Sequence, residues 1–133
     1  MSLYGWIGKI LRVNVTDKKI TEVDTIRYAG KFIGGRGIAA RIAWEEIPPW
    51  VDAFDPENKL IIMTGPLNGT LAPTSGGRIT FAGIAPQAYP KPHYSRSNMG
   101  GYWGAELKYA GFDGLILEGK ATSPVYLLSL IHI

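Results

Sequence analysis

Three glycine-rich segments contain the residues whose types and spacing could bind an anion. The first is Gly34-Gly35-Arg36-Gly37, whose backbone amides could hold a phosphate where a helix begins. A tight turn between two helices, with an exposed arginine, accounts for the same residues. The segment is not a Walker loop, because no Gly-Lys-Thr/Ser follows its glycines. Both interpretations therefore stay open on the sequence.

The second segment runs from residue 64 to residue 77 and is followed by Arg78. It is rich in glycine, proline, threonine and serine, which favour turns. Long loops without periodicity are uncommon in compact domains unless they bind a ligand. Arg78 begins the next predicted strand, where its guanidinium could bind a phosphate through two parallel hydrogen bonds. A solvated surface loop is the alternative.

The third segment is Ser97-Asn98-Met99-Gly100-Gly101-Tyr102-Trp103-Gly104, in which Asn98 stands just before a glycine pair that begins a short predicted helix. An asparagine at this place is predicted to cap the helix N-terminus. The same geometry would offer the amides of Gly100 and Gly101 to a phosphate and a carbonyl oxygen of Asn98 to a hard cation. Asn98 is therefore a candidate metal ligand as well as a cap.

No catalytic residue can be assigned in this chain. His93 stands alone in a proline-rich segment and Glu106 stands alone on a short helix, and no nucleophile is paired with a base. The sequence contains no cysteine, which excludes disulfides and iron–sulfur ligation within these residues. A cysteine-free chain is compatible with a cytoplasmic location, which we expect.

Composition excludes several classes of protein. The 133 residues are 46% hydrophobic and 19% charged, with 17 glycines and 9 prolines, which is too apolar for disorder and too interrupted for a coiled coil. The net charge of +3 comes without a basic run, so we expect no nucleic-acid partner. No apolar run approaches the roughly 18 residues of a membrane span, and the first nine residues do not form a signal peptide.

The elements that must position these segments follow from hydrophobic periodicity. Strands are predicted at residues 9–15, 20–23, 60–64, 78–82, 115–118 and 125–127, and helices at 26–33, 38–47 and 101–110, the last with Gly111 as its C-cap. Residues 84–98 contain three prolines and are predicted to be an extended loop. Strands outnumber helices and do not alternate with them, which indicates an α+β fold with a mixed sheet and short helices.

The last six residues, Leu128-Ser129-Leu130-Ile131-His132-Ile133, have a separate explanation. They are the translation of one frame of a transposase end sequence, CTGTCTCTTATACACATC, used in sequencing libraries. We expect residues 1–127 to be native and residues 128–133 to be adapter read-through. A hydrophobic edge strand is the alternative.

Read in order, the motifs of this chain resemble the N-terminal domain of the aldehyde ferredoxin oxidoreductase family, the tungsten bis-pterin enzymes. The resemblance extends from about Tyr4 to Tyr126. The matching motifs are residues 6–14, 32–37, 56–60, 64–70, 72–78, 98–101, 106–113 and 118–121.

The resemblance implies a protein several times longer than this chain. In the family, two similar α+β halves form one domain that holds two molybdopterins around one tungsten, sometimes molybdenum. A helical remainder supplies the cysteines of a [4Fe-4S] cluster. This chain would then be the first half of the duplicated pterin-binding domain. The whole protein would oxidise a small aldehyde or act on an acyl substrate, pass electrons to ferredoxin or an electron-transfer subunit, and form homo-oligomers.

The resemblance also assigns roles to particular residues. Arg78 matches the family arginine that contacts a pterin. Asn98, Gly100 and Gly101 match the Asn-x-Gly-Gly segment that holds pterin phosphate. In the family, the backbone carbonyl of the asparagine also helps ligate a magnesium ion that bridges the phosphates of the two pterins. No residue of this chain matches a catalytic group or a tungsten ligand.

One segment departs from the family pattern. Between Arg78 and Asn98, the aldehyde enzymes carry a turn similar to Ser-Pro-Leu-Thr-Gly, whereas residues 83–97 here are longer and rich in proline, tyrosine and histidine. This difference leaves a second enzyme open, the active-site subunit of a tungsten-dependent aromatic (benzoyl) acyl-CoA reductase. A non-catalytic module that binds phosphate or a small ligand is the alternative of a different class.

Overall fold

A computed structural model describes residues 4–73, 77–87 and 90–128. The predicted non-native segment lies outside these residues except for Leu128, and its origin stays a prediction. Six strands form one sheet: β1 (Lys9–Asn14), β2 (Lys19–Asp24), β3 (Lys59–Met63), β4 (Ile79–Ala85), β5 (His93–Met99) and β6 (Gly114–Glu118). The helices are α1 (Ile26–Ala29), α2 (Gly35–Glu46) and α3 (Trp103–Tyr109).

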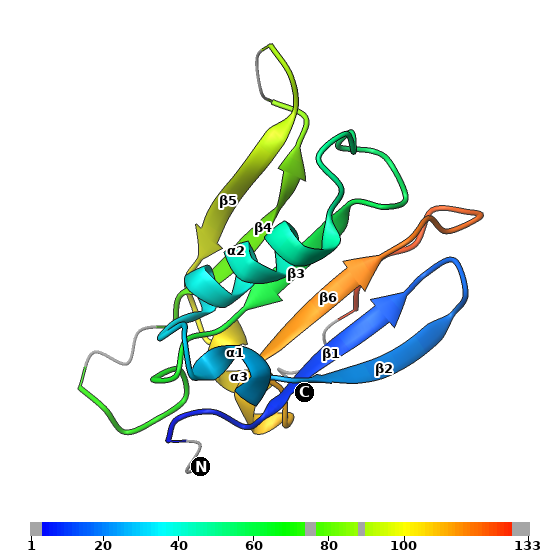
Figure 1. Ribbon diagram of the computed structural model, residues 1–133. Helices are drawn as coiled ribbons and strands as arrows, with labels where there is room; N and C mark the ends of the chain where they lie inside the picture. Colours follow the sequence, from blue (N-terminus) through cyan, green and yellow to red (C-terminus); the bar gives the residue numbers. More distant parts are fainter. Residues whose placement is uncertain (1–3, 74–76, 88–89, 129–133) are drawn as a thin grey trace.

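The sheet has the strand order β2-β1-β6-β3-β4-β5 (Figure 1). β1 and β6 are parallel, and every other neighbouring pair is antiparallel. The mixed sheet with short helices confirms the predicted α+β class. The same order makes β5 an edge strand, which among the described strands pairs only with β4.

One face of the sheet is covered by α1 and α2, which lie in front of it in Figure 1. The apolar side chains of α2 recur at helical spacing, and Ile38 and Ile42 are fully buried against the sheet. The strands contribute alternate residues to this core because successive side chains point to opposite faces. These are Ile10, Ile61, Met63, Ala82 and Ile116. Burial of each large side chain contributes about 1.5–3 kcal/mol.

The opposite face is less completely covered. Ile62, Ile79 and Leu115 are buried there, and Trp103 of α3 packs against them. Beyond α3 the face stays partly open, and Leu60 is 43% exposed. α3 ends as predicted near Gly111, which follows the C-cap Ala110 and has a φ of +95°. The amide of Gly111 donates to the Lys108 carbonyl at 2.9 Å, which satisfies an open helix end.

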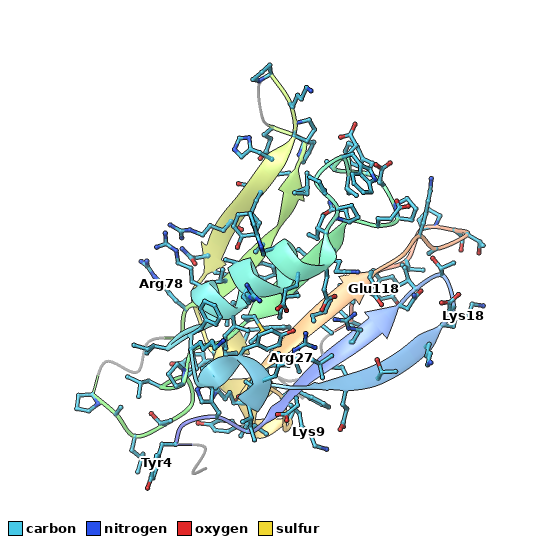
Figure 2. All side chains as sticks on the ribbon, in the orientation of Figure 1. Tyr4, Lys9, Lys18, Arg27, Arg78 and Glu118 are labelled. Atoms are coloured by element: carbon cyan, nitrogen blue, oxygen red, sulfur yellow. The ribbon has the colours of Figure 1, made fainter. Side chains whose placement is uncertain are left out.

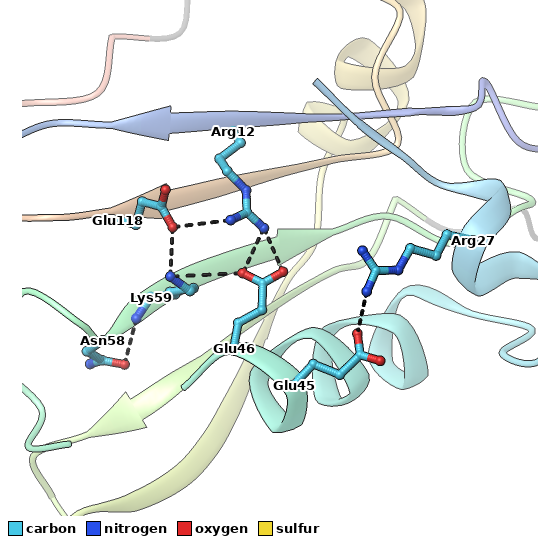
Figure 3. A network of polar contacts seen from close by, with 7 residues as sticks. All are labelled: Arg12, Arg27, Glu45, Glu46, Asn58, Lys59 and Glu118. Carbon is cyan, nitrogen blue, oxygen red and sulfur yellow. Dashed lines mark hydrogen bonds and ion pairs between the residues drawn. The ribbon is translucent and has the colours of Figure 1, made fainter. Parts of the chain in front are cut away.

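Two polar clusters fix the elements to one another. Between α2 and the sheet, Arg12 makes two 2.7 Å bonds to Glu46, and Lys59 lies 2.7 Å from Glu118 (Figure 3). Burial lowers the pKa of Arg12, but the hydrogen bond and charge of Glu46 outweigh this effect and raise it. At the other end of the sheet, the fully buried carboxylate of Asp113 accepts hydrogen bonds from the N-terminal segment.

Three predicted elements were wrong. Residues 84–98 are not a loop, because β4 continues to Ala85 and β5 begins at His93. The prolines lie in the turn and just before β5, and proline is tolerated at the beginning of an edge strand. Residues 125–127 form no strand. The first helix has four residues, and Gly34 is the N-cap of α2 rather than the end of α1.

No helix among the described residues is long and apolar enough to cross a membrane.

Candidate functional site

The three glycine-rich segments meet at one end of the sheet. Met63 pairs with Thr80, and Ile79 pairs with Met99. Continued along the antiparallel strands, this register places Arg78 opposite both Gly65 and Gly100. α2 begins at the same place, because a Cβ built on Gly35 would fall 2.1 Å from the Thr64 carbonyl oxygen. The fold therefore joins segments that are far apart in the sequence.

Close backbone contacts hold together the junction of the three glycine-rich segments. A Cβ built on Gly77 would lie 1.8 Å from the carbonyl oxygen of Gly101, and one on Gly104 would lie 2.5 Å from Ile79 Cγ2. These glycines allow the loop before β4 to pack directly on the entry to α3. Glycine is required at these two positions by contact rather than by unusual dihedral angles.

Asn68 connects the loop that follows β3 to the start of β4 through hydrogen bonds. Its side chain is buried, its Oδ1 accepts a 2.7 Å hydrogen bond from the Gly65 amide, and its Nδ2 donates to the Arg78 carbonyl at 3.3 Å. The main chain of Arg78 is thereby fixed while its guanidinium is exposed. Figure 2 shows Arg78 on the side of the molecule where α2 begins. No ion pair of Arg78 is found within the described part of the chain.

Asn98 has a different position from the one predicted. It lies in β5 opposite Thr80, whose hydroxyl donates to Asn98 Oδ1 at 3.2 Å. The N-cap of α3 is Tyr102, which makes no side-chain capping bond. The capping prediction was wrong because the strand continues to Met99. Asn98 is exposed next to Arg78 and Gly100, where a ligand can reach it.

Gly100 and Gly101 leave open space above the junction. A Cβ on either residue would meet nothing within 4 Å, and both residues are exposed. Gly101 has a φ of +93°, which disfavours other residues there. Gly100 has no such constraint and no packing neighbour, so nothing within the described chain explains the absence of a side chain at this position.

The remaining candidates do not form a catalytic group. His93 is exposed at the start of β5 opposite Ala85, and Glu106 is half-buried on α3. Across the described ranges, no group of three His, Cys, Asp or Glu side chains could hold a metal ion. The arrangement can bind an anion through guanidinium and amide groups, with an asparagine oxygen available to a cation.

Comparisons with known proteins show the family to which the chain is similar. The sequence model of the aldehyde ferredoxin oxidoreductase N-terminal domain matches residues 10–129. The chain is 50% identical over 127 residues to the tungsten-containing aldehyde ferredoxin oxidoreductase of Pyrococcus abyssi, covering 94% of this chain and 20% of that protein. It is 38% identical over 133 residues to the WOR-like subunit of an aliphatic sulfonate oxidoreductase of Pyrococcus furiosus, again covering 94% of this chain and 20% of that protein.

A solved structure is also similar. The active-site complex of benzoyl coenzyme A reductase with 1,5-dienoyl-CoA contains a chain that matches with a TM-score of 0.83 and 39% identity. The match covers 90% of this chain and 18% of that one. The present chain thus spans about a fifth of the length of the curated relatives it matches.

Proposed function

The chain belongs to the aldehyde ferredoxin oxidoreductase family, and from this premise we propose that it forms the first half of a cradle for a tungsten bis-pterin cofactor. The whole protein would be an oxidoreductase in which tungsten, or molybdenum, exchanges electrons with a small carbonyl substrate. The observation that carries the proposal is the β4–β5 register, which, continued one residue past its last pair, brings Arg78 opposite Gly100 and close to Asn98.

The chemistry of these groups fits a phosphate-bearing cofactor. A phosphate is a dianion with several acceptor oxygens, and Arg78 offers a planar set of donors beside the glycine backbone. The open space over Gly100 and Gly101 allows the ligand to approach the main chain closely. The buried bonds of Asn68 hold the backbone of Arg78 in place before any ligand binds, which lowers the ordering cost of binding.

The residues of this chain would bind and orient the cofactor, and none is proposed to take part in bond-making. Asn98 would present an oxygen to a magnesium ion between phosphates, a ligand type that this cation prefers. The [4Fe-4S] cluster and the contacts with ferredoxin, or with another electron-transfer subunit, would lie in the rest of the protein. We place the protein in the cytoplasm.

The β4–β5 hairpin favours a second candidate substrate. Its proline-rich segment departs from the aldehyde enzymes, and the matched solved structure is a benzoyl coenzyme A reductase. An acyl-CoA reductase is therefore the alternative to aldehyde oxidation. Reduction of a viologen dye with a panel of aldehydes, beside dye-coupled assays with aromatic acyl-CoA esters, separates the two.

Arg78→Ala in the whole protein tests the cofactor proposal. Loss of a charge-assisted contact should weaken cofactor affinity roughly tenfold to a hundredfold, while the fold survives because Arg78 is exposed. Tungsten and pterin content per protein are measured after dialysis, beside the melting temperature of the cofactor-free form. Arg27→Ala, an exposed arginine on α1, is the control.

If Arg78→Ala retains full tungsten and pterin after dialysis, the proposed role of Arg78 is wrong. A non-catalytic ligand-binding module is tested separately by the full open reading frame. A second pterin-binding half and a Cys-x-x-Cys-x-x-x-Cys run downstream would exclude that module, and their absence would favour it.

A further inference from the structure

Two other arginines extend the same surface along α2 and β5. Tyr94, Arg96 and Asn98 are every second residue of β5, so their side chains lie on one face of the sheet. Arg96 pairs with Ala82, whose side chain is buried beneath α2. Because side chains alternate between faces, Arg96 lies on the α2 side of the sheet, between Tyr94 and Asn98. Arg36 lies in the first turn of α2.

Helix and strand geometry bring these two arginines to the same level. The α2 residues Ala40 and Trp44 line an apolar groove together with Tyr94. α2 begins beside Thr64, at the end of the sheet where β5 finishes, and α2 ends beside Ile84 and Tyr94, where β5 starts. α2 and β5 therefore run in opposite directions (Figure 1). Arg36 is one turn from Ala40, a rise of about 6 Å. Arg96 is two residues from Tyr94 in the same direction, a rise of roughly 6.6 Å.

The electrostatics of Tyr94 agree with this placement. Burial raises the pKa of the Tyr94 phenol, and the positive charges of Arg96 and Arg36 oppose that rise. Both guanidinium groups are therefore close enough to act on one hydroxyl. That hydroxyl is buried and has no hydrogen-bond partner among the described residues.

Among the described residues, no carboxylate forms an ion pair with either arginine. The first turn of α2 has no acidic residue, and β4 and β5 have none along their length. The acidic residues at the other end of α2 are engaged elsewhere, Glu45 with Arg27 and Arg41, and Glu46 with Arg12. Neither Arg36 nor Arg96 forms an ion pair within the described residues. Both are exposed, so the surface between the start of α2 and β5 is positive and open.

We propose that Arg36 and Arg96 bind a phosphate dianion between the first turn of α2 and β5, beside the position of Arg78 and Asn98. Two guanidinium groups on neighbouring elements can donate to different oxygens of one phosphate. The phosphate could belong to the pterin cofactor or to a phosphorylated substrate. Only the first source depends on the proposed function, and the experiment separates the two.

Phosphate binding to the whole protein, produced without tungsten, tests the inference. Inorganic phosphate is titrated by isothermal calorimetry into wild type, Arg36→Gln, Arg96→Gln and Arg96→Lys. Each glutamine variant should bind phosphate roughly three- to tenfold more weakly, the range for exposed charged contacts. Arg96→Lys should lie between wild type and Arg96→Gln, because lysine retains the charge without the planar fork. Circular dichroism confirms that the variants are folded.

Lys120→Gln is the matched control, because it removes one exposed positive charge next to β6 at the far end of the sheet. It should change phosphate affinity less than twofold. Unchanged affinity in both Arg36→Gln and Arg96→Gln, or an equal loss in Lys120→Gln, would overturn the inference.

The tungsten-loaded protein then identifies the source of the phosphate. If the cofactor supplies it, inorganic phosphate no longer binds the loaded protein, and Arg96→Gln lowers tungsten content. If the substrate supplies it, the loaded wild type still binds phosphate and Arg96→Gln retains its tungsten. Weakened phosphate binding in the two glutamine variants together with full tungsten in Arg78→Ala would support this inference while contradicting the cofactor role of Arg78.

Discussion

Gly77 and Gly101 lie so close that a Cβ on Gly77 would fall 1.8 Å from the carbonyl oxygen of Gly101. This contact joins the end of the long loop to the segment that leads into α3. Arg78 follows Gly77 directly, and Gly100 precedes Gly101. The contact therefore sets the distance between the two parts of the proposed phosphate site.

Gly77→Ala should separate these two parts. The new methyl group cannot be accommodated unless the backbone moves, because its neighbour is a main-chain oxygen. We expect a loss of about 1–3 kcal/mol in unfolding free energy and a lower tungsten content of the whole protein. Denaturant unfolding and metal analysis measure the two effects. Gly30→Ala is the control, because its Cβ would meet nothing within 4 Å. Equal stability of Gly77→Ala and wild type would contradict the claim that Gly77 packs too closely on Gly101 to admit a side chain.

Gly100→Ala should separate ligand binding from folding. A Cβ at Gly100 meets no protein atom within 4 Å, and φ there is not in the left-handed region. The melting temperature of the cofactor-free protein should therefore stay within error of wild type. If the cofactor phosphate lies against this backbone, tungsten and pterin content should fall. Full cofactor content in Gly100→Ala would show that no ligand contacts Gly100.

Asp113→Asn should be the most destabilising single change among these predictions. Asp113 is fully buried and accepts bonds from the Ile7 and Gly8 amides at 2.9 and 2.7 Å and from Thr25 Oγ1 at 2.8 Å. Its Oδ1 is also 3.2 Å from Lys108 Nζ. Burial lowers the pKa of Lys108 and the charge of Asp113 opposes this effect, so the substitution leaves a buried ammonium unbalanced. We expect a loss of about 3–5 kcal/mol.

The double variant Asp113→Asn with Lys108→Met is the matched test of that explanation. If the unbalanced ammonium causes most of the loss, the double variant should be more stable than Asp113→Asn in urea unfolding. If the double variant is less stable than Asp113→Asn, the backbone bonds rather than the ion pair account for the effect.

Part of this fold could be predicted because its signals are local. The hairpin of β1 and β2, the buried strand β3 and the body of α2 each show their own period or turn residues. β5 carries no such signal, because its residues are mostly polar and it lies at an edge, so hydrophobic alternation is absent. Residues 125–127 show the opposite case. They are apolar but exposed, and among the described strands none pairs with them.

The site was predictable motif by motif but not as an assembly. Arg78, Asn98, Gly100 and Gly101 were singled out from the sequence, and the register of β4 and β5 brings their positions together. Their cofactor roles stay predictions. Arg96 was missed, because its importance depends on Arg36, which is 60 positions earlier in the sequence. Only the opposite directions of α2 and β5 in the fold bring the two arginines to the same level, and no periodicity within one element indicates this.

Tyr28→Phe should change the pH dependence of stability. Tyr28 is 2% exposed, and its hydroxyl has no partner among the described residues. Burial raises its pKa above the ordinary value of 10.0, and Arg27 opposes this rise. The fold thus favours the neutral phenol, so its contribution is fully present below pH 10 and is lost as pH rises through the raised pKa.

The phenylalanine variant should therefore lose less unfolding free energy than wild type above pH 10. At neutral pH it should gain about 1 kcal/mol, because an unpaired buried hydroxyl is removed. Urea unfolding across this pH range measures both effects. Tyr126→Phe, at 84% exposure, should leave the neutral-pH value unchanged. Parallel profiles of Tyr28→Phe and wild type would contradict the explanation.

The 133-residue chain produced alone should retain no tungsten or pterin and should self-associate. The proposed cradle needs a second half, and the chain spans about a fifth of its curated relatives. The sheet face opposite α2 is partly open, with Leu60 43% exposed beside Leu117, Phe81 and Val13. Open apolar faces of this kind favour association in water.

Leu60→Lys tests which face of the sheet causes the self-association. It adds a charge to the open face without touching the core beneath α2, so the average mass in sedimentation velocity should fall toward the monomer. Trp44→Lys, which changes an 82% exposed side chain on α2, is the matched control and should leave self-association as in wild type. If Trp44→Lys dissociates the chain while Leu60→Lys does not, the groove beside Tyr94 is the associating surface. If the chain alone is monomeric at every concentration and holds stoichiometric tungsten, the single half suffices and the two-half cradle is wrong.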